Sequence, residues 1–321
     1  MKLLATMITG ALVILASIQM AACDEHKIGG MTADQEFPDP KVATLARSAC
    51  DGDLDTLYRV LKDGADPNGK GKDGATPIFW AMACQGVQGV EALLKAGADP
   101  NQRLPEGDTP VTVAAGMKSP AILKLLLKYH GDPNAINESR PYVAGNALAN
   151  ALTVGIYGYG WDNYYALLDA GANINKATDF GETIATAAAS LGAFNKVAEL
   201  LNRGYDYDLI ELGGLVQNPN IGNPAERAEV IKMLEARGVK FPIPPLIKLY
   251  SGRVRMTNDG TLVVIWHGGR TKSGEIVQPW HQTIKRGDPS YDDILKRVGG
   301  LKPGYGVGIP RSPDDPASLA K

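Results

Sequence analysis

The chain has 321 residues, of which 44% are hydrophobic and 21% are charged, and its formal net charge is −2. These fractions are ordinary for a globular domain. The near balance of charge gives no electrostatic support for a nucleic-acid partner, so we expect none. After the first apolar segment, no run reaches the length that spans a membrane, which excludes a polytopic membrane protein.

The first 22 residues have the features of an export signal. Met1-Lys2 supplies a positive start, and residues 3–18 are almost uninterruptedly apolar. Met20-Ala21-Ala22-Cys23 then resembles a bacterial lipobox, in which the cysteine receives lipid and becomes the mature N-terminus. The resemblance implies lipidation of Cys23, and several acyl chains would anchor the protein firmly. An ordinary secretory signal and an uncleaved anchor helix are the alternatives.

The residue after the lipobox bears on location. Asp24 resembles the residue that retains many enterobacterial lipoproteins in the inner membrane, although this rule varies between lineages. We therefore expect a lipid-anchored protein on the periplasmic face of the envelope, in the inner membrane, with the outer membrane as the alternative. Residues 23–40 would form a tether between the anchor and the folded part.

A five-residue word recurs at a fixed period further along the chain. Gly-Ala-Asp-Pro-Asn occurs at residues 64–68 and again at 97–101, and residues 130–134 are a near copy one period of 33 later. Weaker copies begin at Gly171 and Gly204, again 33 apart, and only the interval between the third and fourth copies is longer, by eight residues. A fixed period of this length indicates stacked structural repeats.

The residues around each word predict one kind of unit. A leucine pair such as Leu93-Leu94 closes an amphipathic run before the word, and the glycine can adopt the left-handed backbone that ends a helix. Turn-forming residues follow, and Thr76-Pro77 and Thr109-Pro110 then offer a cap and a first residue for the next helix; Thr183-Ile184 keeps the threonine. The predicted unit is a turn, a short helix, a tight reversal and a second helix.

This unit resembles the ankyrin repeat. The family's Thr-Pro-Leu-His-x-Ala motif is similar to Thr76–Ala81 and Thr109–Ala114, and its Gly-Ala-Asp-x-Asn ending matches the recurring word. The resemblance covers residues 41–241, with five good units and a degenerate sixth at Ala225–Gly238. It implies a mostly α-helical ankyrin-repeat solenoid. Because Phe79, Thr112 and Thr186 replace the family's histidine, we expect the hydrogen bonds that brace the turns to be lost.

Beyond Phe241 the repeat pattern stops. Residues 242–245 are typical of a short stiff linker. Strands are predicted at Lys248–Met256, Thr261–Trp266 and Ile276–Ile284, a helix at Tyr291–Val298, and a loose tail from Lys302 to Lys321. We expect residues 242–321 to form a small α+β appendage or a C-terminal cap, because the last repeat of a solenoid otherwise exposes an apolar face.

The three cysteines leave one pair if Cys23 is lipidated. Cys50 and Cys84 lie near the ends of first helices in adjacent units. Stacked helices are about 8–10 Å apart, whereas a disulfide needs Cα atoms within about 7 Å. The pair could form a disulfide in an oxidising compartment, or the two cysteines could be buried free thiols; the sequence does not decide between these alternatives.

Catalysis has no support in the sequence, and we expect no cofactor or metal. The four histidines have no metal-ligand spacing, and no nucleophile, phosphate-binding or dinucleotide-binding motif occurs. The histidines are His26, His130, His267 and His281.

Two candidate surfaces remain for a protein partner. The extra eight residues are expected around Thr153–Asp162, as a mobile loop that presents Tyr157, Tyr159 and Trp161; packing of these rings against local helices is the alternative. The resemblance also implies that ankyrin arrays bind through a concave groove made by the projecting turns and first helices. The groove residues would be Lys70, Lys72, Asp73, Trp80, Arg103, Glu106, Asp108, Met117, Glu138, Arg140, Asp179, Phe180 and Glu182.

The combination of an ankyrin array and a lipid anchor resembles immunity proteins for type VI secretion effectors, several of which attack phospholipids in the periplasm. It implies a protein that binds and neutralises a secreted toxin, and we expect a monomer before the partner binds. The alternatives are a periplasmic scaffold for an endogenous enzyme such as a catalase, and an envelope component that contacts lipid or peptidoglycan through the appendage.

Overall fold

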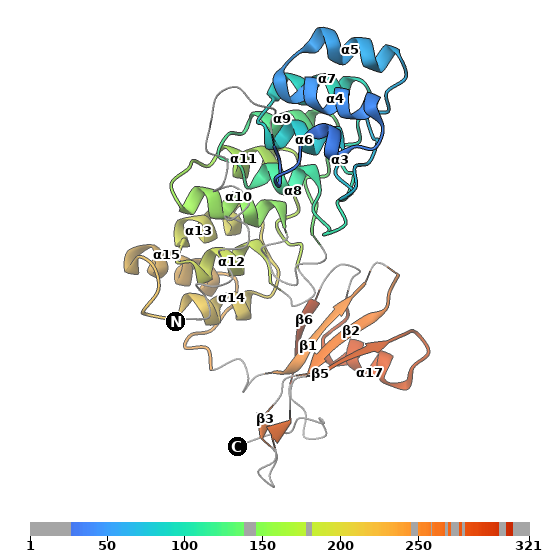
Figure 1. The fold of residues 1–321 in the computed structure, drawn as a ribbon. Coiled ribbons are helices and arrows are strands. Elements are labelled where there is room, and N and C mark those ends of the chain that lie inside the picture. The colour runs from blue at the N-terminus through green and yellow to red at the C-terminus, as the bar shows by residue number, and fades with distance from the viewer. Residues whose placement is uncertain are drawn as a thin grey trace. The chain divides into compact units, whose positions relative to one another are not determined.

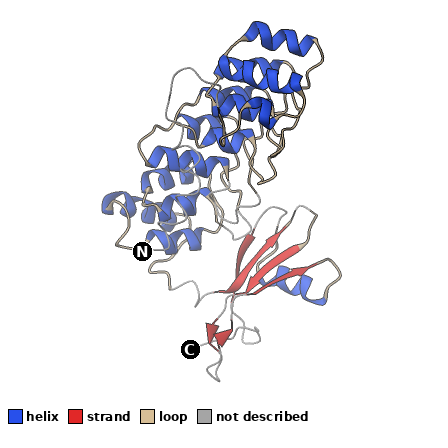
Figure 2. Cartoon of the chain, in the orientation of Figure 1, coloured by secondary structure: helices blue, strands red, loops and turns tan. Residues whose placement is uncertain are grey.

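The computed structural model describes residues 27–137, 146–177, 182–244, 250–257, 259–266, 269–270, 276–277, 280–301 and 306–310 (Figure 1). The predicted signal sequence, including Cys23, lies outside the described residues. The chain divides into two compact units, Met1–Gly97 and Ala98–Lys321. Both contain pairs of helices, and the second also contains a β-sheet (Figure 2).

The first unit contains two repeats. The first repeat is the pair α4 (Pro40–Asp51) and α5 (Leu54–Lys62), and the second is α6 (Pro77–Ala83) and α7 (Val87–Lys95). A short helix, α3 (Ala33–Glu36), precedes them. Buried alanine and leucine side chains of α4 and α7 form much of the core of this unit.

The second unit begins with four further repeats, so the array is longer than the five good units of the sequence pattern. The helix pairs are α8 (Pro110–Ala115) with α9 (Ala121–Lys128), α10 (Ala147–Ile156) with α11 (Asp162–Asp169), α12 (Ile184–Ser190) with α13 (Phe194–Asn202), and α14 (Leu209–Val216) with α15 (Pro224–Glu235). The predicted sixth repeat is thus a complete pair, because α14 supplies a first helix that its sequence pattern did not reveal.

The recurring word is explained by the bonds that its asparagine makes. Gly64 and Gly97 have φ of +88° and +92°, as expected for residues that end a helix, and His130 adopts the same left-handed backbone at +68°. The side chain of Asn68 donates to the carbonyl of Gly97 at 3.0 Å, and that of Asn101 donates to the carbonyl of His130 at 3.0 Å. Each asparagine therefore ties its own turn to the turn of the next repeat.

Two of the helix caps retain the bonds that the sequence analysis expected to be lost. The hydroxyls of Thr109 and Thr183 accept the N–H groups of Thr112 and Thr186 at 3.2 Å, and the hydroxyls of Thr112 and Thr186 accept in return at 2.9 and 2.8 Å. The expectation was wrong at these positions because a threonine hydroxyl can complete a reciprocal capping box.

The cap of α6 differs. Thr76 has the backbone geometry of an N-cap but its side chain makes no capping hydrogen bond, and the buried hydroxyl has no partner. Phe79 stands three residues later, where the other two repeats have a threonine, so no side-chain hydroxyl can complete the box.

The segment expected to be a tether is partly folded. Thr32 caps α3 with a reciprocal capping box, and Ala33 and Phe37 are buried against Val42 and Trp80. This helix was not predicted because a single four-residue helix has no periodic pattern. Residues 32–37 are therefore folded across both repeats of the first unit: they pack on α4 and on Trp80 of α6, and the N–H groups of Lys72 and Asp73 donate to Glu36.

A disulfide joins the two repeats of the first unit. Cys50 and Cys84 are bonded, and their Cα atoms are 5.4 Å apart. Helix α7 also approaches α4 closely, so that a Cβ on Gly89 of α7 would overlap the carbonyl oxygen of Ala49 in α4. A side chain at this position would push the two helices apart.

The last repeat is covered by the chain that follows it. Val239 and Ile243 are buried, and a Cβ on Gly213 of α14 would lie 2.5 Å from the terminal carbon of Ile243. The Gln217 side chain holds this segment by donating to the Ile243 carbonyl at 2.7 Å and accepting its N–H at 2.8 Å. The residues read as a stiff linker thus contribute to the cap that the array requires.

The appendage is a four-stranded antiparallel sheet with one helix. The strands are β1 (Tyr250–Met256), β2 (Leu262–Trp266), β5 (Trp280–Ile284) and β6 (Gly306–Pro310), in the order β5-β2-β1-β6; β3 (Gly269–Arg270) pairs with β4 (Ile276–Val277). Helix α17 (Pro289–Arg297) lies beside the sheet (Figure 2). Its buried residues Tyr291 and Ile294 form one core cluster with apolar residues of the strands.

The prediction of a loose tail was wrong for residues 306–310, which form strand β6. This strand pairs with β1, and Ile309 is completely buried. The alternation of Gly306, Val307 and Gly308 lowers strand propensity, so the sequence did not indicate a strand there. Residues 311–321 lie outside the described residues.

Candidate partner-binding surfaces

The groove prediction fails at one residue of the first unit. Lys70, Lys72 and Asp73 are exposed on a turn, as expected. Trp80 is only 3% exposed, and its ring packs edge-on against Phe37 with centroids 5.7 Å apart. The indole belongs to the core beneath the N-terminal segment, so Trp80 cannot serve as an anchor for a partner.

The predicted groove residues of the second unit differ in exposure. Arg103 and Glu106 are exposed, whereas Asp108 is buried and accepts a hydrogen bond from the Thr112 hydroxyl at 3.1 Å. Asp108 therefore stabilises a turn, and its prediction as a partner-contact residue was wrong. Glu182 is half-buried. Four predicted groove residues lie outside the described part of the chain: Glu138, Arg140, Asp179 and Phe180.

Met117 is not on a first helix. Helix α8 ends at Ala115, and half-buried Met117 lies in the turn that reverses the chain into α9. Its carbonyl accepts a hydrogen bond of 2.6 Å from the side chain of Asn163 in the next repeat. Met117 thus lies in a turn between a first and a second helix, and its prediction as a first-helix residue of the groove was wrong.

The extra eight residues are divided between two places. Asn146, the N-cap of α10, lies 12 positions after Asn134, whereas Thr109 lies eight positions after Asn101, so part of the insertion precedes α10. The rest lengthens α10, which has 10 residues against six in α8. The expected mobile loop at Thr153–Asp162 is therefore helical up to Ile156, and only residues 157–161 form a turn.

The three aromatic residues of this turn have different surroundings. Tyr157 and Tyr159 are each 50% exposed, as expected for contact residues. Trp161 is half-buried: it fills the space beside Gly155, where a Cβ would overlap the indole, and it meets the Tyr164 ring edge-on at 5.8 Å. Trp161 therefore follows the local-packing alternative, and the two tyrosines do not.

A buried lysine lies against Trp161. Lys196 of α13 is 6% exposed, and its ammonium lies 4.2 Å from the centroid of the Trp161 ring and 4.7 Å from that of Tyr165. The same nitrogen donates to the Tyr165 hydroxyl at 2.6 Å and to the Glu199 carboxylate at 2.9 Å. A cation surrounded by aromatic faces is stabilised by their quadrupoles, more so when water is excluded.

The charges of this cluster are compensated. Burial disfavours the charged form of Lys196, but the hydrogen bonds to Tyr165 and Glu199 outweigh it and raise the pKa of the ammonium. Burial likewise disfavours ionised Glu199, but Lys196 and Arg203 together lower the pKa of its carboxyl. Both groups are charged at neutral pH, so Lys196 ties the fifth repeat to the reversal turn of the fourth.

Sequence reasoning missed Lys196, although a signal exists. Counted back from the leucine pair that ends each second helix, Lys196 occupies the position of Gly89, Ile122 and Asn163, all of which are buried. A lysine at a buried register position needs partners, because burying an unpaired charge is costly. The repeat alignment could have identified it.

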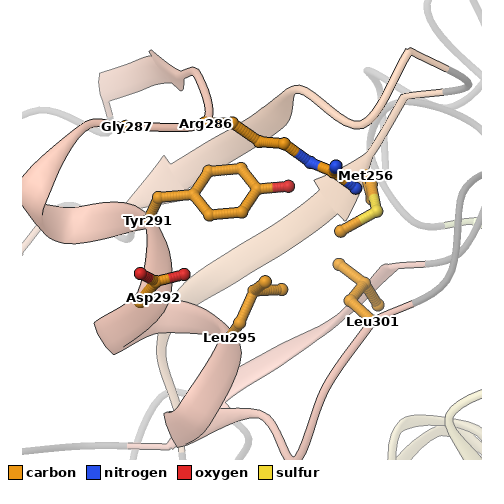
Figure 3. Close-up of a pocket in the computed structure, with 7 residues that line it drawn as sticks. All are labelled: Met256, Arg286, Gly287, Tyr291, Asp292, Leu295 and Leu301. Atoms are coloured by element: carbon orange, nitrogen blue, oxygen red, sulfur yellow. The ribbon is translucent and has the colours of Figure 1, made fainter.

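The appendage carries a small pocket of about 470 Å³ (Figure 3). Met256, Leu295 and Leu301 line it with apolar atoms, and Arg286 and Asp292 supply one charge of each sign. The Tyr291 hydroxyl donates to the carbonyl of Gly260 at 2.6 Å, so its polar group is already satisfied. These lining residues do not form a recognisable catalytic arrangement.

The described residues contain no group of three or more histidine, cysteine or acidic side chains placed to hold a metal ion. Among the helices that the structure describes, none combines the length and the apolar character required to cross a membrane.

In both units, helix pairs follow one another and turn asparagines tie each repeat to the next. This arrangement defines the class: a repeat scaffold with the ankyrin fold, of the kind that binds proteins. Residues 45–137 match the family model described as ankyrin repeats (3 copies). No curated protein matches the chain. Ankyrin repeats are a protein–protein interaction module, and a protein partner is what this fold implies.

Proposed function

We propose that this chain is a lipid-anchored periplasmic protein that binds and neutralises a secreted antibacterial effector, for example a phospholipase. The observation that carries the proposal is an ankyrin-repeat scaffold placed directly behind the lipobox at residues 20–23. An anchored inhibitor would meet a toxin in the compartment where the toxin acts. A rigid array also loses little conformational entropy on binding, which favours tight inhibition.

The bond between Cys50 and Cys84 supports the proposed address. Disulfides form and persist in oxidising compartments such as the bacterial periplasm and are rare in the cytosol. Asp24 favours retention in the inner membrane, by its resemblance to the retention residue of many lipoproteins.

The test is protection of a bacterial host. The product of the gene adjacent to this chain's gene would be directed to the host periplasm, with and without the full-length chain. We expect the chain to restore growth and to co-purify with that product, and a chain that lacks residues 1–22 to give no protection. Absence of protection contradicts the immunity role, and a neighbouring catalase stabilised by the chain would favour the scaffold role.

The anchor has a separate test. Replacement of Cys23 by alanine should move the protein from the membrane fraction to the soluble fraction after a carbonate wash. If the variant stays in the membrane fraction, lipid is not the anchor, whatever the outcome of the protection assay.

A further inference from the structure

The exposed apolar side chains of the second unit gather on the reversal turns. Four large hydrophobic side chains are exposed among its described residues, and three of them, Tyr157, Tyr159 and Leu191, lie where a first helix turns into a second. Contiguous exposed apolar surface marks interaction sites, and tyrosine is enriched among the residues that anchor a partner. We define the reversal edge as Met117, Lys118, Tyr157, Tyr159, Trp161 and Leu191.

Contacts between successive repeats link these turns to one another. The Asn163 side chain of the fourth repeat donates to carbonyls of the third-repeat turn, including that of Met117. The ammonium of Lys118 lies 4.3 Å from the centroid of the Tyr159 ring. Lys196, which follows the turn that begins at Leu191, packs on Trp161. The three turns are therefore held in a fixed order.

The aromatic turn is also rigid at its base. Trp161 packs against Gly155 on one side and against Lys196 on another, and the backbone N–H of Tyr159 donates to the carbonyl of Val154 at 3.1 Å. Tyr157 and Tyr159 thus project from a supported turn. Preorganised aromatic side chains lose little entropy on binding.

The charge of the reversal edge indicates what a partner would present. Lys118 is exposed, and in the described part of the chain its contact is the Tyr159 ring, with no carboxylate at ion-pair distance. The exposed acid that follows Trp161, Asp162, is in the first turn of α11, where the helix dipole stabilises a negative charge. Lys118 is therefore the group left to attract an opposite charge.

We propose that the reversal edge is a docking surface for a protein segment that places an apolar side chain on the tyrosine rings and a carboxylate at Lys118. The inference rests on the proposed role as a protein-binding module and assigns it a surface other than the groove. The groove lost Trp80 and Asp108 to the interior, whereas the reversal edge keeps two half-exposed tyrosines and a leucine.

A displayed library of random twelve-residue peptides is the probe. It would be selected on the full-length protein in mild detergent, and the selected peptides would be titrated against variants. We expect an Asp or Glu close to an aromatic or aliphatic residue in those peptides. The double variant Tyr157→Ser/Tyr159→Ser should weaken their binding by roughly tenfold or more, since central aromatic anchors dominate interface energetics.

Charge reversal tests the carboxylate. Lys118→Glu should weaken acidic peptides and strengthen the same peptides with lysine in place of the acid. The matched control is Lys70→Glu, an exposed groove lysine, which should change neither. Selection of no peptide, or loss of binding only in groove variants such as Lys70→Glu and Glu106→Lys, overturns the inference.

Vesicles of phosphatidylethanolamine and phosphatidylglycerol form the second arm. If the tyrosine variant of a Cys23→Ala chain loses binding to vesicles but keeps binding to peptides, the reversal edge contacts lipid and the inference is wrong. The protection assay distinguishes failure of this inference from failure of the proposed function. If the wild type protects the host and the reversal-edge variants protect it equally well, only the docking surface is refuted. If the wild type gives no protection, the immunity role is refuted.

Discussion

At the scale of single residues, Thr76 and Thr109 hold the same position in consecutive repeats but make different contacts. The Thr109 hydroxyl accepts the N–H of Thr112, whereas the buried Thr76 hydroxyl has no partner. Thr109→Val should therefore lower the free energy of unfolding by about 1 kcal/mol, the usual value of a cap. Thr76→Val should have no cost, because it removes an unsatisfied buried hydroxyl. Equal losses in urea denaturation would contradict the assignment of the caps.

The pair Lys196 and Glu199 predicts how stability depends on pH. The pKa of Glu199 lies below its ordinary value of 4.5 in the folded state, so its contribution is complete above pH 4.5 and is lost as the pH falls through the folded pKa. The pKa of Lys196 lies above 10.5, so its contribution is complete below pH 10.5 and is lost as the pH rises through the folded pKa. The pair therefore stabilises across the neutral range.

Glu199→Gln tests this. At pH 7 the free energy of unfolding of the variant should be lower by about 1.5–3 kcal/mol, the range for hydrogen bonds to charged groups, and the difference should shrink below pH 4.5. The control is Glu235→Gln, an exposed glutamate at the end of α15, which should show no such trend. A loss at Glu199 that does not vary with pH would refute the ion pair.

Single residues also show the limits of sequence reasoning. Tyr157 and Tyr159 were predicted as exposed aromatic residues and are exposed, whereas Trp161 of the same stretch packs beside Gly155. Trp80 was misassigned because its burial depends on Phe37, a residue of the supposed tether, and no local pattern links two residues so far apart. Asp179 and Phe180 lie outside the described residues and stay predictions.

At the scale of elements, the packing of second helices sets stability. In α7, Leu94 is buried and Val87 is exposed, so the two residues form a matched pair within one helix. Leu94→Ala should cost roughly 2–5 kcal/mol and weaken the neighbouring repeat too, since each repeat packs on the next. Val87→Ala should change stability by less than about 0.5 kcal/mol. If both variants change the free energy of unfolding by a similar small amount, Leu94 is not packed in the core as described.

The bridge between α4 and α6 gives a second prediction at this scale. Cys84→Ser opens a closed loop with a sequence separation of 34, which should lower the free energy of unfolding by about 2–4 kcal/mol. The same loss should appear when the wild-type protein is unfolded with a reductant, and the reductant should not affect the variant. Free thiols titrated in the unreduced, denatured Cys23→Ala chain would contradict the bridge.

The repeat elements were predictable and the terminal elements were not. A period of 33 fixes helix pairs, since the same glycine and leucine signals recur in each copy. Helix α3 and strand β6 occur once, are short, and are stabilised by contacts with distant residues, Trp80 and β1 respectively. Helix α14 was missed because Gly213 and Gly214 lower its helix propensity, which packing against Ile243 overrides.

At the scale of the whole molecule, the scaffold with the ankyrin fold indicates a protein that binds another protein. The proposed location at the cell envelope depends on the predicted lipobox and is supported by the disulfide between the first two repeats. The repeats carry exposed charged and aromatic side chains on their turns. Together with the ankyrin fold, these side chains support recognition of a protein.

The most direct test of that central claim is calorimetric titration of the protein with the purified product of the adjacent gene. We predict saturable binding that Tyr157→Ser/Tyr159→Ser weakens tenfold or more at unchanged thermal stability. Variants of the appendage pocket, Arg286→Ala and Asp292→Ala, should bind like the wild type. If the pocket variants lose binding while the variants of the reversal edge and of the groove keep it, the appendage rather than the repeats is the functional surface.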